Sequence, residues 1–229
     1  MSAGIGTLWL VATPIGNLGD LPPRAVEVLA GAALVCCEDT RRTGRLLQHA
    51  GIRAERLAVA NDHTEAQRVA EVLDLLAAGR DIAVVTDAGT PGISDPGERL
   101  VRAALDAGHP VSAVPGPAAA VMALVVSGLP TARFVFEGFV PRSGRDRSER
   151  LAEIAAERRT VVLYEAPHRI ERTMADLRAA CGDDRRLFEP FSGPGFAAVP
   201  GFGTDVPRRA QQFVADVTSG AGSSITNEA

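Results

Sequence analysis

The sequence predicts an α/β layer fold in two domains, and three observations carry this prediction. The first half of the chain alternates short apolar runs with amphipathic stretches. Turns rich in glycine and proline follow several of the apolar runs. The chain has 229 residues, of which 46% are hydrophobic, enough for one large domain or two small ones with cores of their own.

Strands are expected where a short apolar run stops at a polar or glycine-rich turn. The runs in the first half are Leu8–Ala12, Ala33–Cys37, Ile82–Thr86 and Val111–Val114. Each is too short for an independent helix, and a helical pattern follows most of them. The order predicts a parallel sheet with crossover helices.

The first two helices between these strands are predicted from their ends. Pro22–Gly31 has a proline in its first turn and an apolar face, which are typical of a helix. Asp39 can cap a second helix that runs through His49 and stops at Gly51.

Three more helices are predicted further along. Thr64 and Gln67 form a capping-box pattern for a helix that ends at Gly79. The stretch DPGE at 95–98 offers a cap, a first-turn proline and an N3 acid for a helix ending at Gly108. Pro117–Ser127 is apolar on all sides, which predicts a fully buried helix.

A second unit follows a change of pattern. Its expected elements are a strand at Phe134–Phe136, an exposed loop GFVPRSGRDR, a helix Ser148–Glu157, a strand Thr160–Tyr164 and a helix Pro167–Ala180. We therefore predict an N-terminal α/β domain at 1–130, a linker and exposed loop at 131–147, a partial C-terminal α/β domain at 148–190 and an atypical, poorly ordered tail at 191–229.

Composition excludes several kinds of chemistry. All 24 basic residues are arginine, so no lysine can form a Schiff base, act as a base or serve a P-loop. Neither GxxxxGK[ST] nor a GxGxxG after the first strand is present. The three cysteines and four histidines show no metal-ligand spacing, so no metal is expected, and reduced buried thiols suit a cytoplasmic protein. No signal peptide or membrane span is expected.

Three turns at strand ends are candidate ligand sites, because open α/β sheets bind ligands at the carboxyl ends of their strands. They are TPIGN at 13–17, DAGTPG at 87–92 and PGPAA at 115–119. Any one of them could be an ordinary βα turn, but three together favour a site. The Asp87 carboxylate could accept ribose hydroxyls or meet a cationic ligand, or it could simply form an Asx turn.

Two charged clusters are the other candidates. CCEDTRRTGR places Glu38 and Asp39 before Arg41 and Arg42, which fits either a site or a capped helix with solvated arginines. A second cluster is rich in arginine, and its helical part is expected to be a solvated face. The arginines of its loop are better phosphate candidates because they lie beside glycine and proline: Arg142, Arg145 and Arg147.

Several sequence words now identify a family resemblance. LVATPIGNLGDLPPRAVEVL, CCEDTRRTGRLL, NDHTE, VVTDAGTPGISDPG, PGPAA, FEGFVPRSG and YEAPHR occur in this order. Together they resemble the ribosomal RNA small subunit methyltransferase I family of the tetrapyrrole-methylase-like superfamily, from about Leu8 to Arg186.

The resemblance implies a two-domain tetrapyrrole-methylase-like (class III methyltransferase) fold, with S-adenosylmethionine held between the domains. It implies methylation of a cytidine ribose 2′-hydroxyl in small-subunit (16S) rRNA, by a homodimer that acts on rRNA or the ribosomal particle. It also implies that the EDTR segment lies near the substrate, where Arg41 and Arg42 would contact RNA together with Arg142, Arg145 and Arg147. The three turns are implied to line the cofactor cleft through Pro14, Ile15, Gly16, Asp87, Ala88, Gly89, Thr90, Pro117, Ala118 and Ala119.

A 2′-hydroxyl is a poor nucleophile, so a proton acceptor should assist the transfer, and Glu38 and Asp39 are the candidates. Two other functions stay open. One is methylation of a small, precorrin-type tetrapyrrole. The other is binding of cofactor or RNA without turnover.

The C-terminus departs from the family pattern. Family members continue with a strand that carries an ARELTK-like word, whereas here GDDRR leads into LFEPFSGPGFAAVPGFG. We therefore expect the second domain to be incomplete. A frameshift or a truncated gene would produce such a change, and resequencing the codons for 185–189 would test this hypothesis.

Overall fold

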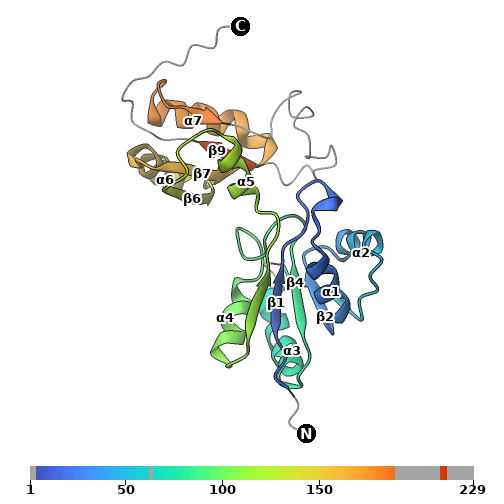
Figure 1. Cartoon of the computed structure of the whole chain (residues 1–229). Coiled ribbons are helices and arrows are strands. Elements are labelled where there is room, and N and C mark those ends of the chain that lie inside the picture. Colours follow the sequence, from blue (N-terminus) through green and yellow to red (C-terminus); the bar gives the residue numbers. More distant parts are fainter. Residues whose placement is uncertain (1–3, 62–63, 189–211, 216–229) are drawn as a thin grey trace. The chain divides into compact units, whose positions relative to one another are not determined.

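The computed structural model describes residues 4–61 and 64–188 and the backbone of 212–215 (Figure 1). The chain divides into two compact units, and the boundary between them falls after Ala119. This is earlier in the chain than the predicted boundary at residue 130.

The first unit is built on a five-stranded parallel sheet. Its strands lie in the order β3-β2-β4-β1-β5. Their bounds are β1 (Leu8–Val11), β2 (Leu34–Cys37), β3 (Leu57–Val59), β4 (Ile82–Val85) and β5 (Val111–Val114). The three-residue strand β3 was not predicted, because so short an apolar run gives no periodic signal. In the centre of the sheet, Leu8 of β1 pairs with Ile82 of β4 and Val111 of β5, so these three strands end at one level.

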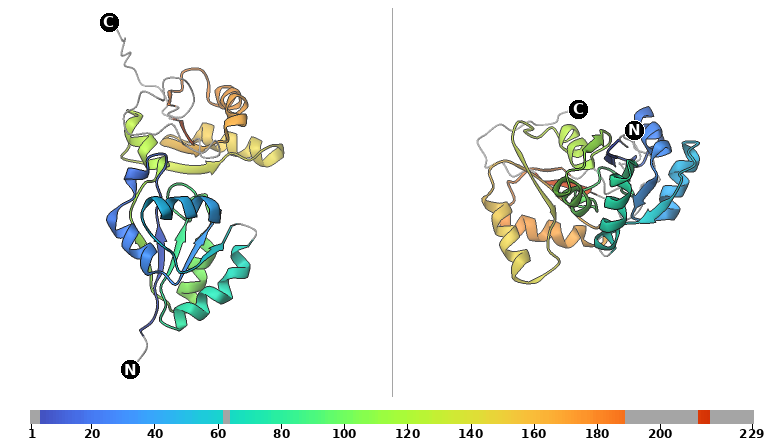
Figure 2. Two further views of the ribbon diagram at one scale, coloured as in Figure 1. Left: turned by 90° about the vertical axis from the view of Figure 1, so that its right-hand side faces the viewer. Right: turned by 90° about the horizontal axis from the view of Figure 1, so that it is seen from below.

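Helices cover both faces of this sheet, as expected for a parallel sheet. They are α1 (Pro23–Gly31), α2 (Thr40–His49), α3 (Glu65–Ala77) and α4 (Glu98–Asp106), and a short 3-10 turn η1 (Leu18–Asp20) follows β1. Alternate strand residues face opposite sides: Leu8 packs with Leu76 and Leu100 of α3 and α4, whereas Val85 packs with Leu29 of α1. Figures 1 and 2 show α1 and α2 on one face and α3 and α4 on the other. The α/β prediction is confirmed for this unit.

The predicted helix caps hold in one case and fail in two. The Asp39 side chain accepts a hydrogen bond from the Arg41 N–H and caps α2 as predicted. The capping box at α3 is displaced, because Thr64 exchanges hydrogen bonds with Asn61 instead of with Gln67. The reciprocal pair therefore closes one turn earlier in the chain.

The start of α4 is capped from another helix. Its N-cap residue is Gly97, at a φ of 136°, and not the predicted Asp95. The carboxylate of Glu65, in the first turn of α3, instead accepts hydrogen bonds from the N–H groups of Gly97 (3.0 Å) and Leu100 (3.1 Å). Glu65 is only 6% exposed, so α3 and α4 are joined by a buried charged cap.

The second unit has a four-stranded sheet in the order β6-β7-β9-β8. Strands β6 and β7 are parallel, and β9 runs antiparallel to β7 and β8. Its core contains Ile154 of α6, Leu163 of β7 and Leu177 of α7. The elements are α5 (Ala119–Val126), β6 (Phe134–Phe139), α6 (Gly144–Ala156), β7 (Thr160–Tyr164), η2 (Pro167–Arg169), α7 (Ile170–Cys181), β8 (Leu187–Phe188) and β9 (Gln212–Ala215).

Two predictions for this region are corrected. The segment 131–147 is not a linker and loop throughout, because β6 extends to Phe139 and α6 already begins at Gly144. The predicted tail at 191–229 contains the strand β9, and its other residues lie outside the described part of the chain.

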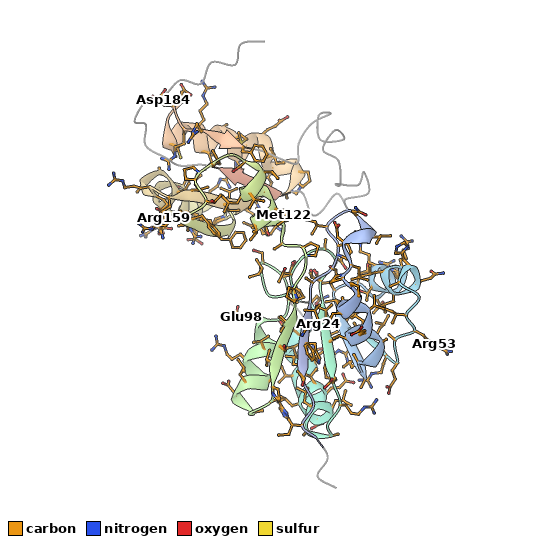
Figure 3. All side chains as sticks on the ribbon, in the orientation of Figure 1. Arg24, Arg53, Glu98, Met122, Arg159 and Asp184 are labelled. Atoms are coloured by element: carbon orange, nitrogen blue, oxygen red, sulfur yellow. The ribbon has the colours of Figure 1, made fainter. Side chains whose placement is uncertain are left out.

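The apolar helix α5 is only partly buried, so the prediction of full burial is wrong. Ala120, Ala123 and Leu124 are buried, whereas Val125 and Val126 are 57% and 51% exposed. Met122, labelled in Figure 3, is 37% exposed. Eight residues make about two turns, and one side of such a helix suffices for packing.

Candidate active site

The three candidate turns of the first unit come together and are joined by hydrogen bonds. They follow β1, β4 and β5, which are neighbours in the sheet. Thr13 and Gly89 form an isolated antiparallel bridge: the Thr13 N–H donates to the Gly89 carbonyl (2.8 Å), and the Gly89 N–H donates back (3.1 Å). The Thr90 hydroxyl donates to the Pro117 carbonyl at 2.9 Å. The turns therefore form one interlocked surface at the carboxyl end of the sheet.

Glycine is needed at two places in this surface. Gly89 has a φ of 101°, a region that residues with a side chain rarely adopt. At Gly116, a Cβ atom would lie 2.8 Å from the Cβ of Ala12 and would push the third turn away from the end of β1. Both glycines allow backbone to approach backbone closely.

The remaining residues of these turns are mostly sheltered. Pro14 and Ile15 are buried, as are Gly89 and Ala119. The other predicted positions are half-buried: Gly16, Asp87, Ala88, Thr90, Pro117 and Ala118. Half-buried backbone suits a ligand held largely by main-chain groups.

Asp87 is the charged residue of this surface. Its Oδ2 pairs with an Arg42 guanidinium nitrogen at 3.0 Å. Its Oδ1 is buried and has no hydrogen-bond partner among the described residues. Burial raises the pKa of the carboxyl, and the nearby Glu38 carboxylate raises it further, while Arg42 opposes both effects. A buried acceptor without a donor is a candidate contact for a ligand hydroxyl or ammonium group.

Glu38 holds the start of this turn in place. One of its carboxylate oxygens accepts the Asp87 N–H at 2.9 Å and also the Thr86 hydroxyl. Glu38 follows β2 and Asp87 follows β4, which are adjacent strands. The strand-end glutamate thus fixes the aspartate turn across the sheet edge.

Asp39 has a different environment from Glu38. Its carboxylate caps α2 and is bound by the Arg41 side chain through both oxygens. The hydrogen bonds from Arg41 hold the pKa of Asp39 below its usual range. Both properties weaken Asp39 as a proton acceptor, so Glu38 is the better candidate.

The predicted RNA-binding arginines lie in several environments. Arg41 has a side chain that is 88% exposed and pairs only with Asp39. Arg42 lies in α2 and its guanidinium pairs with Asp87, beside the interlocked turns. Arg145 is exposed and pairs with Glu149, and Arg142 is exposed with no interaction of its side chain among the described residues.

Arg147 is buried, which contradicts its assignment to an exposed, RNA-binding loop. Its side chain is 5% exposed and is bound to Asp176, to the Thr173 hydroxyl and to the Pro141 carbonyl. Thr173 in turn donates to the buried Glu165 carboxylate. These partners bind the buried guanidinium of Arg147 on several sides, so it stabilises the core of the second unit and cannot reach RNA.

Sequence reasoning missed two features of this kind. The link from Arg42 to Asp87 joins residues on different elements, so spacing along the chain cannot reveal it. The second missed feature is the buried pair of Glu165, from YEAPHR, and Arg147, from the segment predicted to be a loop. A helix that begins at Gly144 would have placed Arg147 on its buried face, and its periodicity was the signal that could have shown this.

The cysteines and two of the histidines are the remaining groups to be placed. Cys36 and Cys37 are buried, and Cys181 is half-buried. His168 lies in η2, whereas His63 lies outside the described residues. No cluster of three or more metal-ligating His, Cys, Asp or Glu side chains occurs in the described part of the chain. None of the helices described there is long and apolar enough to cross a membrane.

The carboxyl end of a parallel α/β sheet, where these interlocked turns lie, is where proteins of this class bind their ligands. Residues 7–188 match the family of tetrapyrrole (corrin/porphyrin) methylases, and the chain belongs to this family.

Several curated relatives that match this chain share one name. The chain is 51% identical over 183 residues to a ribosomal RNA small subunit methyltransferase I from Synechocystis sp., covering 80% of this chain and 65% of the relative. It is 49% identical to the protein of that name from Pseudomonas aeruginosa and 48% identical to that of Escherichia coli O157:H7, covering 81% and 79% of this chain and 65% and 63% of those relatives. The predicted resemblance is confirmed. The chain thus spans a little under two thirds of the length of these relatives.

The solved structures support the fold. A uroporphyrin-III C-methyltransferase from Thermus thermophilus superimposes with a TM-score of 0.54 at 23% identity, covering 92% of this chain and 94% of that chain. The predicted tetrapyrrole-methylase-like α/β fold is therefore confirmed.

Proposed function

We propose that this chain methylates small-subunit rRNA with S-adenosylmethionine, at the ribose 2′-hydroxyl of a cytidine. The observation that carries the proposal is the identity of about half of the aligned residues, over about 80% of this chain, with relatives named ribosomal RNA small subunit methyltransferase I. The cytidine and the 2′-oxygen come from the family resemblance.

The interlocked turns fit S-adenosylmethionine. Asp87 offers a buried carboxylate oxygen without a donor, which suits a ribose hydroxyl or an ammonium group. The glycine-containing turns leave backbone accessible beside it, from Pro14–Gly16, Asp87–Thr90 and Pro117–Ala119. When bound there, the cofactor supplies an electrophilic methyl group on a sulfonium.

Glu38 is the residue that we assign to accept the hydroxyl proton. One carboxylate oxygen is used to hold Asp87 and Thr86, and the second oxygen is left to accept a proton. Asp39 is a weaker candidate, since Arg41 occupies both of its oxygens. Alignment by the rigid turns should contribute the larger part of the rate.

The RNA contacts that we retain are Arg41, Arg142 and Arg145, which are exposed. Arg42 and Arg147 are left out because they pair with Asp87 and Asp176. We further propose that the protein acts on rRNA or the ribosomal particle as a cytoplasmic homodimer, as the family resemblance implies.

The direct test is mass spectrometry of small-subunit rRNA from cells with and without the gene. We expect a 2′-O-methylated cytidine that disappears with the gene and returns with the wild-type chain. An rRNA with identical modifications in both strains would refute the proposal.

Two variants of Glu38 separate its roles. Glu38→Gln keeps an oxygen that can accept the Asp87 N–H but removes the proton acceptor, so we expect turnover to fall while cofactor affinity is retained. Glu38→Ala removes both functions, so both quantities should fall. Unchanged turnover in Glu38→Gln would exclude Glu38 as the acceptor.

The alternative is methylation of a small tetrapyrrole, which the family description favours. Labelled S-adenosylmethionine offered with a precorrin-type substrate or with unmodified small-subunit particles distinguishes the two. We expect label in the rRNA. Label in the tetrapyrrole would support the alternative, and cofactor or RNA binding without any transfer would support a protein that binds without turnover.

A further inference from the structure

The second unit carries a cavity that none of the functional assignments above uses. It has a volume of about 730 Å³ and lies where β6 and β7 begin and α6 ends. Loop residues before β6 form one wall, and the turn between α6 and β7 forms the other. Its lining residues are Pro130, Ala132, Arg133, Ala156, Glu157, Arg158, Arg159 and Thr160.

The two walls are fixed to one another. The Thr160 hydroxyl donates to the Pro130 carbonyl at 2.6 Å, which ties the loop before β6 to the first residue of β7. Thr160 is fully buried, so this bond is protected from solvent. On the other wall, Arg185 donates to the carbonyls of Ala155 and Glu157 and closes the end of α6. The cavity is therefore held open by a defined framework.

The charges around this cavity are unbalanced in favour of cations. Glu157 is its one acidic lining residue, and its carboxylate is bound by the Arg159 side chain and by the N–H groups of Arg158 and Arg159. These bonds lower the pKa of Glu157 to about 2, so the pair with Arg159 is maintained at neutral pH. Arg159 is labelled in Figure 3, beside α6. Glu157 and Arg159 thus neutralise each other and leave Arg133 and Arg158.

Arg133 and Arg158 differ from most arginines of the second unit. Seven arginines there pair with carboxylates, and Arg185 binds carbonyls. Within the described residues of that unit, three arginine side chains have no interaction: Arg133, Arg142 and Arg158. Two of these three line the same cavity. Their guanidinium groups are exposed and free to form bidentate bonds to phosphate oxygens.

We propose that this cavity is a second RNA contact, in which Arg133 and Arg158 bind backbone phosphates away from the reacting nucleotide. Arg133 precedes β6, whereas Arg142, a retained RNA contact, follows it. Six strand residues at about 3.3 Å each separate the two ends of β6 by roughly 20 Å. Two contacts at this separation suit a large RNA that spans both positions and not a single nucleotide.

The proposal rests on the proposed rRNA substrate, and it is tested by the salt dependence of RNA binding. The full chain, with both arginines changed in Arg133→Gln/Arg158→Gln, is titrated with unmodified small-subunit rRNA over a series of salt concentrations. Each lost phosphate contact should reduce the slope of log affinity against log salt by about 0.7–0.9. We therefore expect the slope to fall by roughly 1.4–1.8, with S-adenosylmethionine affinity unchanged.

A matched control removes two other charges from the same unit. Arg172→Gln/Arg178→Gln changes two exposed arginines of α7 that already pair with carboxylates. We expect this control to keep nearly the wild-type slope. Equal slopes in the cavity variant and the wild type would overturn the proposal, as would an equal loss in the two double variants. A thermal melt of each variant confirms that it is folded.

A second probe separates failure of this cavity proposal from failure of the proposed rRNA methylation. If the wild-type chain methylates no rRNA, polyuridylate replaces rRNA as the probe of the cavity. A reduced slope in the cavity variant alone would then still support a phosphate-binding cavity. A slope equal to that of the wild type would refute it.

Discussion

The cap that joins α3 to α4 gives a quantitative prediction. Glu65→Ala removes the acceptor of two N–H groups, those of Gly97 and Leu100, in a region where water does not replace it. A hydrogen bond to a charged group contributes about 1.5–3 kcal/mol, but removing the carboxylate also ends the cost of its burial. We therefore expect a loss of about 2–4 kcal/mol in the free energy of unfolding.

The assay is thermal or denaturant unfolding of the full chain. At roughly 3–5 °C per kcal/mol for a domain of this size, Tm should fall by about 10 °C. Glu65→Gln keeps an acceptor oxygen without the charge and should lose about 1 kcal/mol.

Glu98→Ala is the matched control for this prediction. Glu98 is in the first turn of α4, where the sequence motif would place the capping acid, but its side chain is 82% exposed (Figure 3). We expect it to cost no more than about 0.5 kcal/mol. If Glu98→Ala destabilises the chain as much as Glu65→Ala does, the assignment of the cap to Glu65 is wrong.

Three further predictions concern single side chains. Because the pKa of Asp87 is raised in the folded chain, its protonation should weaken S-adenosylmethionine binding, measured by calorimetry, at a higher pH than protonation of an ordinary aspartate would. Asp87→Asn should flatten this pH dependence of affinity, and a wild-type pH dependence in the variant would refute the prediction. Arg147→Gln leaves Asp176 without its buried partner and should lower the free energy of unfolding, measured with denaturant, by about 3–5 kcal/mol. The exposed Arg145→Gln should leave that free energy nearly unchanged, and similar losses in the two variants would contradict the prediction. Burial raises the pKa of Cys36 to about 12, so roughly 1 in 10,000 thiols is ionised at pH 8, and mass spectrometry should find it unalkylated in the folded chain but alkylated in urea; rapid native labelling would refute this.

Local signals in the sequence predicted the helices and four of the five strands of the first unit, although two of the predicted caps differ. The Asp39 cap and the strand-end turns depend on residues within one turn of each other, and both appear as expected. The meeting of the three turns also followed from the rule that parallel strands place their carboxyl ends at one edge.

Two failures involve partners that are distant in sequence, whereas the capping box at Thr64 was displaced by a nearby residue, Asn61. Glu65 binds the N–H of the cap residue Gly97, 32 residues later, and Arg147 reaches Asp176, 29 residues away. A local motif at 95–98 and a basic loop pattern were each plausible by themselves, but tertiary contacts decided the outcome. Helix α5 shows the same limit, since composition indicates that a helix is apolar but not which neighbours cover it.

The bridge between Thr13 and Gly89 has a consequence for how this site can change. It continues main-chain pairing past the ends of β1 and β4, so the candidate turns share the rigidity of the sheet. With Thr90 bound to Pro117, no turn can be exchanged for one of another length without releasing its neighbour. Variation and engineering of substrate choice are therefore easiest elsewhere in the chain, where loops are not tied to the turns.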